Sequence, residues 1–456
     1  MTHRFTHPDA IRTRFSEAMS AMYRAEVPLY GDLLSIVAEV NAEILAARPD
    51  LAAEMAGELD RLDVERHGAI RLGTAAELHM MRRAFAVMGM YPVGYYDLSV
   101  AGVPVHSTAF RPVDDDALNA NPFRVFTSLL RLDLIEDEGL RAEAEAILST
   151  RRIFTDEAIR LIEKDAAEGG LDDADADRFV AELLETFRWH GDARVDAATY
   201  HRLHDAHRLI ADVVSFRGPH INHLTPRTLD IDAAQRAMQA RGIDAKAVIE
   251  GPPPRAVPIL LRQTSFKAIE EDVTFPGDQP GQHTARFGEI EQRGAALTPK
   301  GRALYDRLLA TARGEQGSQG ASYAERLATA FTAFPDTIEE LREQGLAWFR
   351  YDLTDAGQRL VGSGVRPAGD IDAWVAAGHV RAVPIVYEDF LPVSAAGIFQ
   401  SNLGGTEQRS YAASAARAAF EDAMGDAVQD ELALYAEMEA RSIMTVRDAL
   451  RGVAAA

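Results

Sequence analysis

The stretch that decides the fold is short and bounded by glycine: His67-Gly68-Ala69-Ile70-Arg71-Leu72-Gly73. Side chains of a β-strand alternate between its two faces, so His67, Ala69 and Arg71 share one face of the predicted strand. Ile70 and Leu72 belong to the opposite, apolar face. A histidine and an arginine on one face can serve a metal ion and an anion side by side. A surface strand with its polar side in water would show the same pattern, so this stretch alone leaves both interpretations open.

The sequence that follows this strand predicts an α+β module. Residues 74–77, Thr-Ala-Ala-Glu, have the pattern of a capping box and predict a helix that ends near Met88. Gly89 stands where a helix-ending glycine is expected. Two strand-like segments, residues 91–98 and 103–110, come next and are predicted to pair. The order strand, helix, strand, strand therefore indicates mixed α and β structure.

The rest of the chain alternates between helical and strand-rich segments. The spacing of apolar residues predicts a helical N-terminal part at residues 8–60, helical insertions at about 133–212 and 300–350, and a helical C-terminal tail at about 410–450. The β-core segments are predicted at about residues 62–132, 213–300 and 380–403. We therefore expect residues 1–456 to form a single catalytic unit, an α+β fold whose sheet core carries large helical insertions.

Charge limits the partners that this chain can have. The 456 residues include 48 Lys and Arg against 70 Asp and Glu, which gives a formal net charge of −22. Such acidity argues against nucleic acid or an anionic membrane as the main partner, because binding to phosphates needs a basic surface. A small anionic substrate held by one buried arginine remains compatible with it.

The absence of cysteine and the distribution of apolar residues exclude further kinds of functional site and of protein. The chain has no cysteine, which excludes disulfides, thiolate zinc sites, iron–sulfur clusters and cysteine nucleophiles. Any metal ion must therefore be held by His, Asp and Glu. The N-terminal residues lack the apolar stretch of a signal peptide, and no run approaches the roughly 18 apolar residues of a membrane span. We expect a cytoplasmic protein, and the composition leaves its oligomeric state open.

Two further segments carry polar residues where strands should be apolar. The first, residues 218–226, reads Gly-Pro-His-Ile-Asn-His-Leu-Thr-Pro and contains His220 and His223. Histidines three residues apart cannot share a strand face, so at most one of them is a ligand if this segment is extended. In a helix or tight turn both could bind, and a polar loop between two prolines is the alternative without a ligand role.

The second segment, residues 286–294, reads Arg-Phe-Gly-Glu-Ile-Glu-Gln-Arg-Gly. Strand alternation places Glu289, Glu291 and Arg293 on one face, so periodicity cannot choose between the two glutamates. A solvated ion pair between glutamate and arginine is the alternative interpretation.

Together with His67, these segments offer two histidines and one carboxylate from separated strands. That is the ligand set of the facial triad, which leaves open positions on Fe(II) for substrate and O₂. The same set could hold Zn²⁺ and a water molecule for hydrolysis, so ligand type alone leaves redox and hydrolytic chemistry open.

A rival histidine cluster occurs in a predicted helix at His201, His204 and His207. Positions three and six residues apart drift around a helix by about 60° per step, so these side chains do not converge on one ion. Charged neighbours such as Arg202 and Asp205 are typical of a solvated face. We therefore assign this cluster a structural or surface role. The chain shows no Ser-His-Asp signature, P-loop or dinucleotide-binding glycine fingerprint.

Longer motifs make the chain similar to a known family. These motifs are residues 67–71, 93–98, 102–110, 122–130, 218–232, 286–302 and 387–403, the last reading Tyr-Glu-Asp-Phe-Leu-Pro-Val-Ser-Ala-Ala-Gly-Ile-Phe-Gln-Ser-Asn-Leu. Over nearly its whole length the chain resembles the bacterial 2-oxoadipate dioxygenase/decarboxylase family, the D-2-hydroxyglutarate synthases of lysine catabolism.

The resemblance implies a core like the vicinal-oxygen-chelate fold, akin to hydroxymandelate synthase and hydroxyphenylpyruvate dioxygenase. It also implies one Fe(II) held by two histidines and one glutamate, at His67, His223 and Glu289. The choice of glutamate follows related dioxygenases, where the ligand is the Glu of a Glu-Ile-x-Gln-Arg strand. Arg71 matches the family's substrate-binding arginine, and Val393 lies in the segment that contacts substrate through its backbone.

The implied reaction is the Fe(II)-dependent conversion of 2-oxoadipate and O₂ to D-2-hydroxyglutarate and CO₂. In it the 2-oxo acid chelates the iron through its carboxylate and keto oxygens, and Arg71 pairs with the distal carboxylate. Two other classes remain to be tested. A non-redox metal lyase, isomerase or hydrolase on the same fold would consume no O₂, and a binding protein with a vestigial site would hold no stoichiometric iron.

Overall fold

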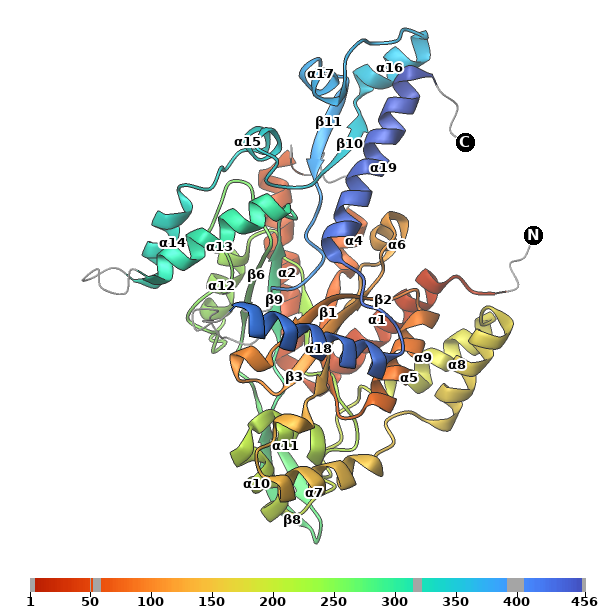
Figure 1. Cartoon of the computed structure of the whole chain (residues 1–456), viewed down its shortest axis with the longest axis vertical. Helices are drawn as coiled ribbons and strands as arrows, with labels where there is room; N and C mark the ends of the chain where they lie inside the picture. The colour runs from red at the N-terminus through yellow and green to blue at the C-terminus, as the bar shows by residue number, and fades with distance from the viewer. Residues whose placement is uncertain (1–4, 50, 52–58, 315–321, 392–405, 453–456) are drawn as a thin grey trace. The chain divides into compact units, whose positions relative to one another are not determined.

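A five-stranded sheet carries the stretch that begins at His67 (Figure 1). Its strands are β1 (Arg66–Leu72), β2 (Tyr91–Asp97), β3 (Val105–Arg111), β4 (Arg124–Leu130) and β5 (His223–Pro226). They lie side by side in the order β2-β3-β4-β1-β5. β1 pairs in parallel with β4, whereas the other three pairings are antiparallel. β1 therefore lies between strands that come from distant parts of the sequence.

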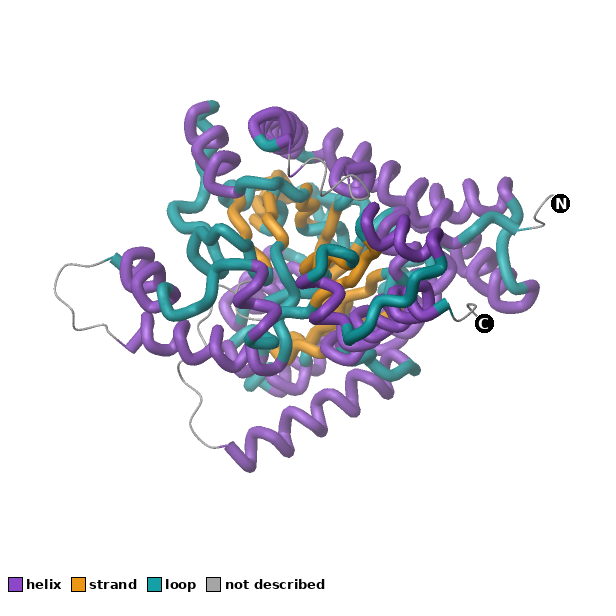
Figure 2. The backbone as a smooth tube through the Cα atoms, turned by 90° about the horizontal axis from the view of Figure 1, so that it is seen from above, coloured by secondary structure: helices purple, strands orange, loops and turns teal. Residues whose placement is uncertain are grey.

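The computed structural model describes residues 5–49, 51, 59–314, 322–391 and 406–452. Contacts divide the chain into two compact units. Unit 1 comprises Met1–Glu250, Gln263–Gln292 and Pro392–Gln429, and unit 2 comprises Gly251–Arg262, Arg293–Leu391 and Asp430–Ala456. The fold is α+β as predicted, with short strands and abundant helix (Figure 2). That the whole chain acts as a single catalytic unit stays a prediction.

The remaining regular structure of unit 1 is mostly helical and includes the predicted insertion at 133–212. Its helices are α1 (Pro8–Glu26), α2 (Pro28–Ala47), α4 (Leu59–Val64), α5 (Ala75–Val87), α6 (Asp115–Ala120), α7 (Glu138–Ser149), α8 (Asp156–Glu168), α9 (Asp173–Leu184), α10 (Ala197–Ala206), α11 (Arg208–Ser215), α12 (Ile231–Ala240) and α18 (Thr406–Met424). Strands β7 (Glu270–Phe275) and β8 (Gln279–Thr284) form an antiparallel hairpin in the same unit.

The helix after β1 begins as the sequence predicts. The Thr74 hydroxyl accepts a hydrogen bond from the Glu77 amide at 3.2 Å, and the Glu77 carboxylate accepts hydrogen bonds from the amides of Gly73 and Thr74. This reciprocal pairing satisfies amides that the first turn of a helix cannot satisfy itself. Gly89 follows the helix with a φ of 65°, which glycine adopts without strain. These local signals therefore place β1 and α5 as predicted.

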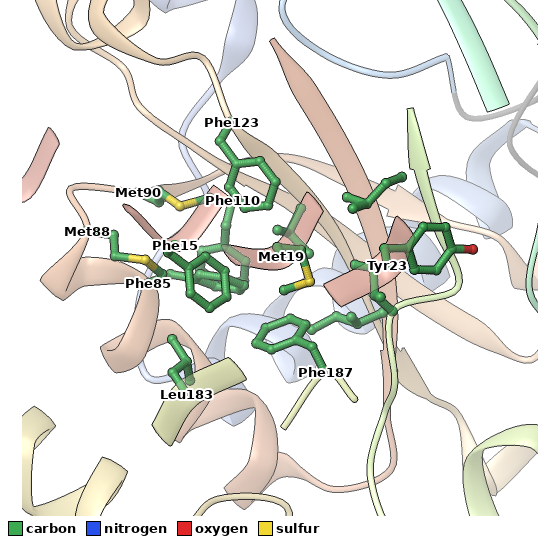
Figure 3. Packing of buried hydrophobic residues seen from close by; sticks show 14 of the residues in the cluster. Phe15, Met19, Tyr23, Phe85, Met88, Met90, Phe110, Phe123, Leu183 and Phe187 are labelled. Carbon is green, nitrogen blue, oxygen red and sulfur yellow. The ribbon is translucent and has the colours of Figure 1, made fainter. Parts of the chain in front are cut away.

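An aromatic core joins the N-terminal helices of unit 1 to the sheet (Figure 3). The ring of Phe15 on α1 meets Phe123 and Phe187 edge to face, with centroids 6.0 and 5.4 Å apart. Phe85 on α5 packs on Phe110 of β3 with a centroid distance of 4.8 Å. Burial of such side chains stabilises the fold by roughly 1.5–3 kcal/mol each. The core therefore gives the sheet a rigid backing.

Unit 2 contains helices and a small antiparallel sheet. Its elements are α13 (Pro299–Gly314), α14 (Tyr323–Phe331), α15 (Ile338–Glu343), β10 (Phe349–Leu353), α16 (Asp355–Ser363), α17 (Ile371–Ala376), β11 (Val380–Pro384) and α19 (Glu431–Arg451). β10 pairs antiparallel with β11, and α19 packs on β10. Two further strands, β6 (Leu261–Ser265) and β9 (Glu289–Arg293), form a separate two-stranded sheet, and most of both strands, residues 263–265 and 289–292, belongs to unit 1.

Two predicted helical segments differ in detail from the structure. The segment at 300–350 ends in β10, which begins at Phe349 and was not predicted. The tail at 410–450 is not one helix, because α18 ends at Met424 and Gly425 follows with a φ of 75°. Asp430 then caps α19 by accepting hydrogen bonds from the amides of Leu432 and Ala433. A left-handed glycine followed by a capping aspartate ends one helix and starts another.

Among the helices that the structure describes, none is both long and apolar enough to cross a membrane.

Candidate metal centre

Three side chains from three strands meet on one side of β1. His67 lies on β1, His223 is the first residue of β5, and Glu289 is the first residue of β9. The Nε2 atoms of His67 and His223 lie 3.3 and 4.0 Å from Oε1 of Glu289. One ligand atom from each residue lies within 4.8 Å of the other two. The structure thus brings together the three residues that the resemblance selects.

Strand pairing explains why the two histidines meet. In the antiparallel ladder between β1 and β5, His67 lies opposite Thr225 and Ala69 lies opposite His223. Positions directly opposite each other or two apart share a face, so both imidazoles project to the same side. Their ring centroids are 5.4 Å apart and the ring planes are nearly perpendicular. The register of this ladder therefore fixes the histidine pair.

The surroundings favour the protonation states that bind metal at His223 and Glu289. Burial lowers the pKa of His223 to about 4, so its imidazole is neutral at neutral pH. Burial alone would raise the pKa of Glu289, but the hydrogen bond with His67 and the electrostatic attraction between the carboxylate and the two imidazoles bring it below its ordinary value. Thr225 and Gln263 donate hydrogen bonds to the same carboxylate at 3.2 and 2.7 Å. A neutral imidazole and an ionised carboxylate are the forms that bind a metal ion.

The second glutamate of β9 lies on the other side of the His67 ring. Oε2 of Glu291 is 2.9 Å from Nδ1 of His67, whereas Glu289 faces Nε2. Burial would lower the pKa of His67, but the charge of Glu291 and hydrogen bonds with both glutamates raise it above its ordinary value. Glu291 is itself fully buried, 3.6 Å from the guanidinium of Arg124.

This geometry separates two glutamates that the sequence could not distinguish. Both point to one face, as predicted, but only Glu289 lies within reach of His67 and His223 together. A carboxylate behind the second nitrogen of a ligating histidine fixes its tautomer and ring orientation. Glu291 occupies that supporting position.

Arg71 lies on the same strand as His67, as predicted. Its Nη1 donates a hydrogen bond to Oδ2 of Asp212 on α11 at 2.7 Å. The Arg71 side chain is 25% exposed, whereas that of Asp212 is 5% exposed. The guanidinium therefore reaches solvent on one side while a buried anion holds it on the other. Val393, which the resemblance also selects, lies outside the described residues.

The two histidines of residues 218–226 serve different groups. His220 lies beside Asp212 and His283 rather than beside His67. The geometry thus brings His223, and not His220, to the candidate metal centre. That at most one of the two histidines is a ligand stays a prediction. Sequence reasoning missed Asp212 and His283. A signal for Asp212 was present, because it is a charged residue inside an apolar helical run that includes Val213 and Val214.

The rival cluster is split in the structure, because His201 and His204 lie on α10 whereas His207 lies between α10 and α11. His201 and His204 are exposed, and the His207 side chain accepts a hydrogen bond from the Leu209 amide at the start of α11.

The donor set of His67, His223 and Glu289 fits a divalent metal ion. It offers two imidazoles and one carboxylate, and Glu291 supports His67 from behind. The three donors leave further coordination positions free for other ligands. Both Fe(II) and Zn²⁺ accept this set, so the donors by themselves are compatible with a metal ion without naming it.

Comparison with known proteins assigns the chain to a family. A family model described as 2-oxoadipate dioxygenase/decarboxylase matches residues 15–402. The 2-oxoadipate dioxygenase/decarboxylase of Pseudomonas putida is 59% identical over 455 residues, which cover 98% of this chain and 98% of that protein. The protein of the same name from Escherichia coli is 59% identical over 436 residues, covering 95% of this chain and 97% of its own.

A solved structure agrees with this assignment. The crystal structure of the hydroxyglutarate synthase from Pseudomonas putida in complex with 2-oxoadipate matches with a TM-score of 0.91 and 57% sequence identity, covering 98% of this chain and 100% of that chain. The chain belongs to the 2-oxoadipate dioxygenase/decarboxylase family, and the resemblance stated from its motifs is confirmed. As a member of that family it is an oxygenase.

Proposed function

We propose that this chain is an Fe(II)-dependent dioxygenase that converts 2-oxoadipate and O₂ to D-2-hydroxyglutarate and CO₂ in lysine catabolism. The observation that carries the proposal is the convergence of His67, His223 and Glu289 beside Arg71. It occurs in a chain 59% identical to 2-oxoadipate dioxygenase/decarboxylases and similar to a hydroxyglutarate synthase crystallised with 2-oxoadipate. The reaction balances, with one O₂ consumed and one CO₂ released per substrate.

The proposed ligands are His67, His223 and Glu289, and the proposed metal is Fe(II). Two histidines and one carboxylate leave room for a bidentate 2-oxo acid and for O₂. When bound, the iron supplies the activation of O₂ and the Lewis acidity that oxidative decarboxylation needs. The proposed ligands come from three separate strands, two of them in the mixed five-stranded sheet, which supports a core like the vicinal-oxygen-chelate fold.

The protein's own residues position the substrate. Arg71 pairs with the distal carboxylate through a charge-assisted contact that fixes both the orientation and the chain length of the diacid. Glu291 keeps the His67 imidazole in one tautomer, so Nε2 stays directed at Glu289 and His223. The backbone of Val393 is proposed to contact the substrate too, and for that residue the support is the resemblance alone.

The function is tested by loading the protein with Fe(II) under anaerobic conditions and following O₂ uptake with a panel of five- to seven-carbon 2-oxo acids. We expect O₂ uptake, CO₂ release and formation of D-2-hydroxyglutarate in equal amounts with 2-oxoadipate. Turnover of 2-oxoadipate without O₂ uptake would instead support the non-redox lyase, isomerase or hydrolase. Failure to bind one equivalent of iron would support a binding protein.

The role of Arg71 has its own test. Arg71→Ala should keep iron binding and lose most turnover, with kcat/KM for 2-oxoadipate lowered by about a hundredfold, because a bidentate contact to the distal carboxylate is removed. Unchanged kinetics would remove Arg71 from the proposal while leaving the metal centre in place.

A further inference from the structure

A buried carboxylate lies directly behind Arg71. Asp212 is 4% exposed and sits in an apolar turn of α11, beside Ile210 and Val213. An ionised carboxylate in such a place is costly unless charged or hydrogen-bonding partners compensate it. The groups that contact the Asp212 carboxylate therefore indicate its role.

Three cationic or imidazole groups converge on this carboxylate. One oxygen, Oδ2, accepts the hydrogen bond from Arg71 at 2.7 Å. The other oxygen, Oδ1, lies 2.9 Å from Nε2 of His283 and 3.2 Å from Nε2 of His220. Burial would raise the pKa of Asp212, but the charges of His220 and Arg71 and the hydrogen bonds with both histidines hold it well below its ordinary value. The carboxylate is therefore an anion that anchors the guanidinium.

The two imidazoles are themselves held in place. Nδ1 of His283 lies 2.9 Å from the hydroxyl of Tyr200. The Trp189 ring stacks on His283 with a centroid distance of 5.9 Å and meets His220 edge to face at 4.7 Å. His220 also has a φ of 24°, a backbone conformation that persists only where the surrounding structure imposes it. Asp212 is thus fixed by a rigid shell of side chains.

This second group, defined by Asp212, His220 and His283, also has the composition of a metal site. Its carboxylate already bears a guanidinium at hydrogen-bond distance, however. A divalent cation added to Oδ1 would lie within a few ångströms of that fixed positive charge, in a buried region where like charges repel strongly. The arrangement suits an anchor for Arg71 better than a second metal ion.

The anchor leaves most of the Arg71 guanidinium available. An arginine offers five N–H donors in a rigid planar fork, and the structure commits Nη1 to Asp212. Because Arg71 and His67 share strand β1, fixing the guanidinium also fixes its separation from the proposed metal ligand. A positioned cation at a set distance from the metal discriminates between substrates by the presence and place of a distal carboxylate.

We infer that Asp212 is a positioning residue that holds Arg71 and thereby makes the enzyme select 2-oxo diacids over 2-oxo monoacids. This inference rests on the proposed function, because it takes Arg71 as the group that binds the distal carboxylate. His220, His283 and Tyr200 act through Asp212 by holding its carboxylate in place.

The test compares Asp212→Asn with the unchanged enzyme on 2-oxoadipate and on 2-oxohexanoate, which has the same carbon chain without the distal carboxylate. We expect the ratio of kcat/KM for the diacid to that for the monoacid to fall by about tenfold, mainly through KM for the diacid. Iron content and kcat/KM for the monoacid should stay within about twofold of the unchanged enzyme. If Asp212 had a merely structural role, kcat/KM would fall equally for the diacid and for the monoacid, and the ratio of the two values would not change.

A double-mutant cycle shows whether Asp212 acts through Arg71. In the Arg71→Ala background, Asp212→Asn should cause no further fall in the ratio, because the group that it positions is absent. Additive losses would contradict the inference. Asp205→Asn is the matched control, because it removes an exposed carboxylate from the neighbouring helix α10, and it should leave the ratio unchanged.

If Asp212→Asn does not fold, a variant with a smaller structural change tests the same inference. Tyr200→Phe removes only the hydroxyl beside His283 and should lower the same ratio by about two- to threefold, with a normal circular dichroism spectrum. An unchanged ratio in this variant, together with an unfolded Asp212→Asn protein, would count against the inference.

The remaining outcomes separate this inference from the proposed function. If Arg71→Ala abolishes the diacid preference and Asp212→Asn preserves it, the anchor is wrong and the proposed function stands. If Arg71→Ala itself leaves the preference intact, the proposed role of Arg71 is wrong. Binding of two metal equivalents, one of them lost in Asp212→Asn, would overturn the anchor in favour of a second metal site.

Discussion

Two groups of two histidines and one carboxylate lie in unit 1, and they differ in what surrounds the carboxylate. At Glu289 the donors besides the imidazoles are the neutral side chains of Thr225 and Gln263. At Asp212 the corresponding position is taken by the guanidinium of Arg71. The first carboxylate keeps its negative charge available for a metal ion, whereas the second has its charge neutralised by the protein itself.

This difference shows that a ligand set is not yet a metal site. His67 and His223 belong to strands whose register brings them to one face, and Glu291 supports His67 from behind. His220 and His283 come from a loop and a hairpin and direct their nitrogens to a carboxylate that is already paired. We therefore base the proposed metal-binding role of the first group and the proposed positioning role of the second on the charge balance around each carboxylate rather than on residue type.

The largest effect is expected from removing one histidine from each group. His67→Ala should abolish stoichiometric iron binding and lower activity by at least about a thousandfold, because two protein ligands hold Fe(II) poorly. His283→Ala should retain one equivalent of iron. Iron content after anaerobic loading and gel filtration measures both. Loss of iron in His283→Ala with retention in His67→Ala would reverse the assignment of the two groups.

A second prediction concerns how much the Asp212–Arg71 pair contributes to the free energy of unfolding. Asp212→Asn removes the buried partner of Arg71 and should destabilise unit 1 by about 3 kcal/mol at pH 7. The folded pKa of Asp212 is depressed, so its contribution is present above the ordinary value of 3.8 and is lost as pH falls through the folded pKa. The difference between the two proteins should therefore persist to pH 5 and narrow below 3.8.

Urea unfolding followed by tryptophan fluorescence measures this difference. Trp189 is the only one of the chain's 3 tryptophans within the ranges of unit 1, and its ring packs on His220 and His283. Its signal therefore reports on the region that Asp212 holds. A difference that disappears between pH 7 and pH 5 would contradict the assignment of the stabilisation to the Asp212 carboxylate.

A third prediction tests the different roles proposed for the two glutamates of β9, Glu289 as a metal ligand and Glu291 as the support of His67. Glu291→Gln should weaken Fe(II) binding by about tenfold, the effect of losing a carboxylate that supports a ligating histidine. Glu289→Gln should weaken it far more, because a ligand is lost. Anaerobic Fe(II) titration of both variants gives the comparison. A larger loss in Glu291→Gln would make Glu291 the ligand.

Much of the first group was predictable from local sequence, because strand alternation and a capping box are local signals. Alternation put His67 and Arg71 on one face, and Thr74 and Glu77 set the start of α5. The same rule could not separate Glu289 from Glu291. Their roles differ only through the two nitrogens of His67, a residue on another strand.

The second group could not be predicted, because its contacts join distant segments. His283 contacts Asp212, which is 71 residues away in the sequence, and the sequence of the hairpin β7–β8 does not predict this contact. Asp212 stood out as a charge in an apolar helical turn, but its partners were set by tertiary packing. The end of α18 was different, since Gly425 and Asp430 are local signals of a helix end and a helix start.

The smallest effect is expected from a substitution at Gly68, where β1 packs against β5 next to His67 and His223. A Cβ added at Gly68 would lie 2.6 Å from the Ile221 side chain and 3.1 Å from the His223 carbonyl oxygen. Gly68→Ala should therefore move β5 outward by a few tenths of an ångström, shift His223 relative to His67, and weaken Fe(II) binding by about two- to fivefold. The preference for diacids should stay unchanged, because the Arg71–Asp212 contact does not involve β5.

Gly362→Ala is the control for this substitution. Gly362 lies in α16, and a Cβ added there meets no atom within 4 Å. Iron affinity should be that of the unchanged enzyme, since an alanine in an open helical position adds no strain. The measurement is the same anaerobic titration, paired with the diacid and monoacid rates. If Gly68→Ala altered the diacid preference and spared iron affinity, the two groups would be coupled through β5, and the separation of metal binding from positioning would fail.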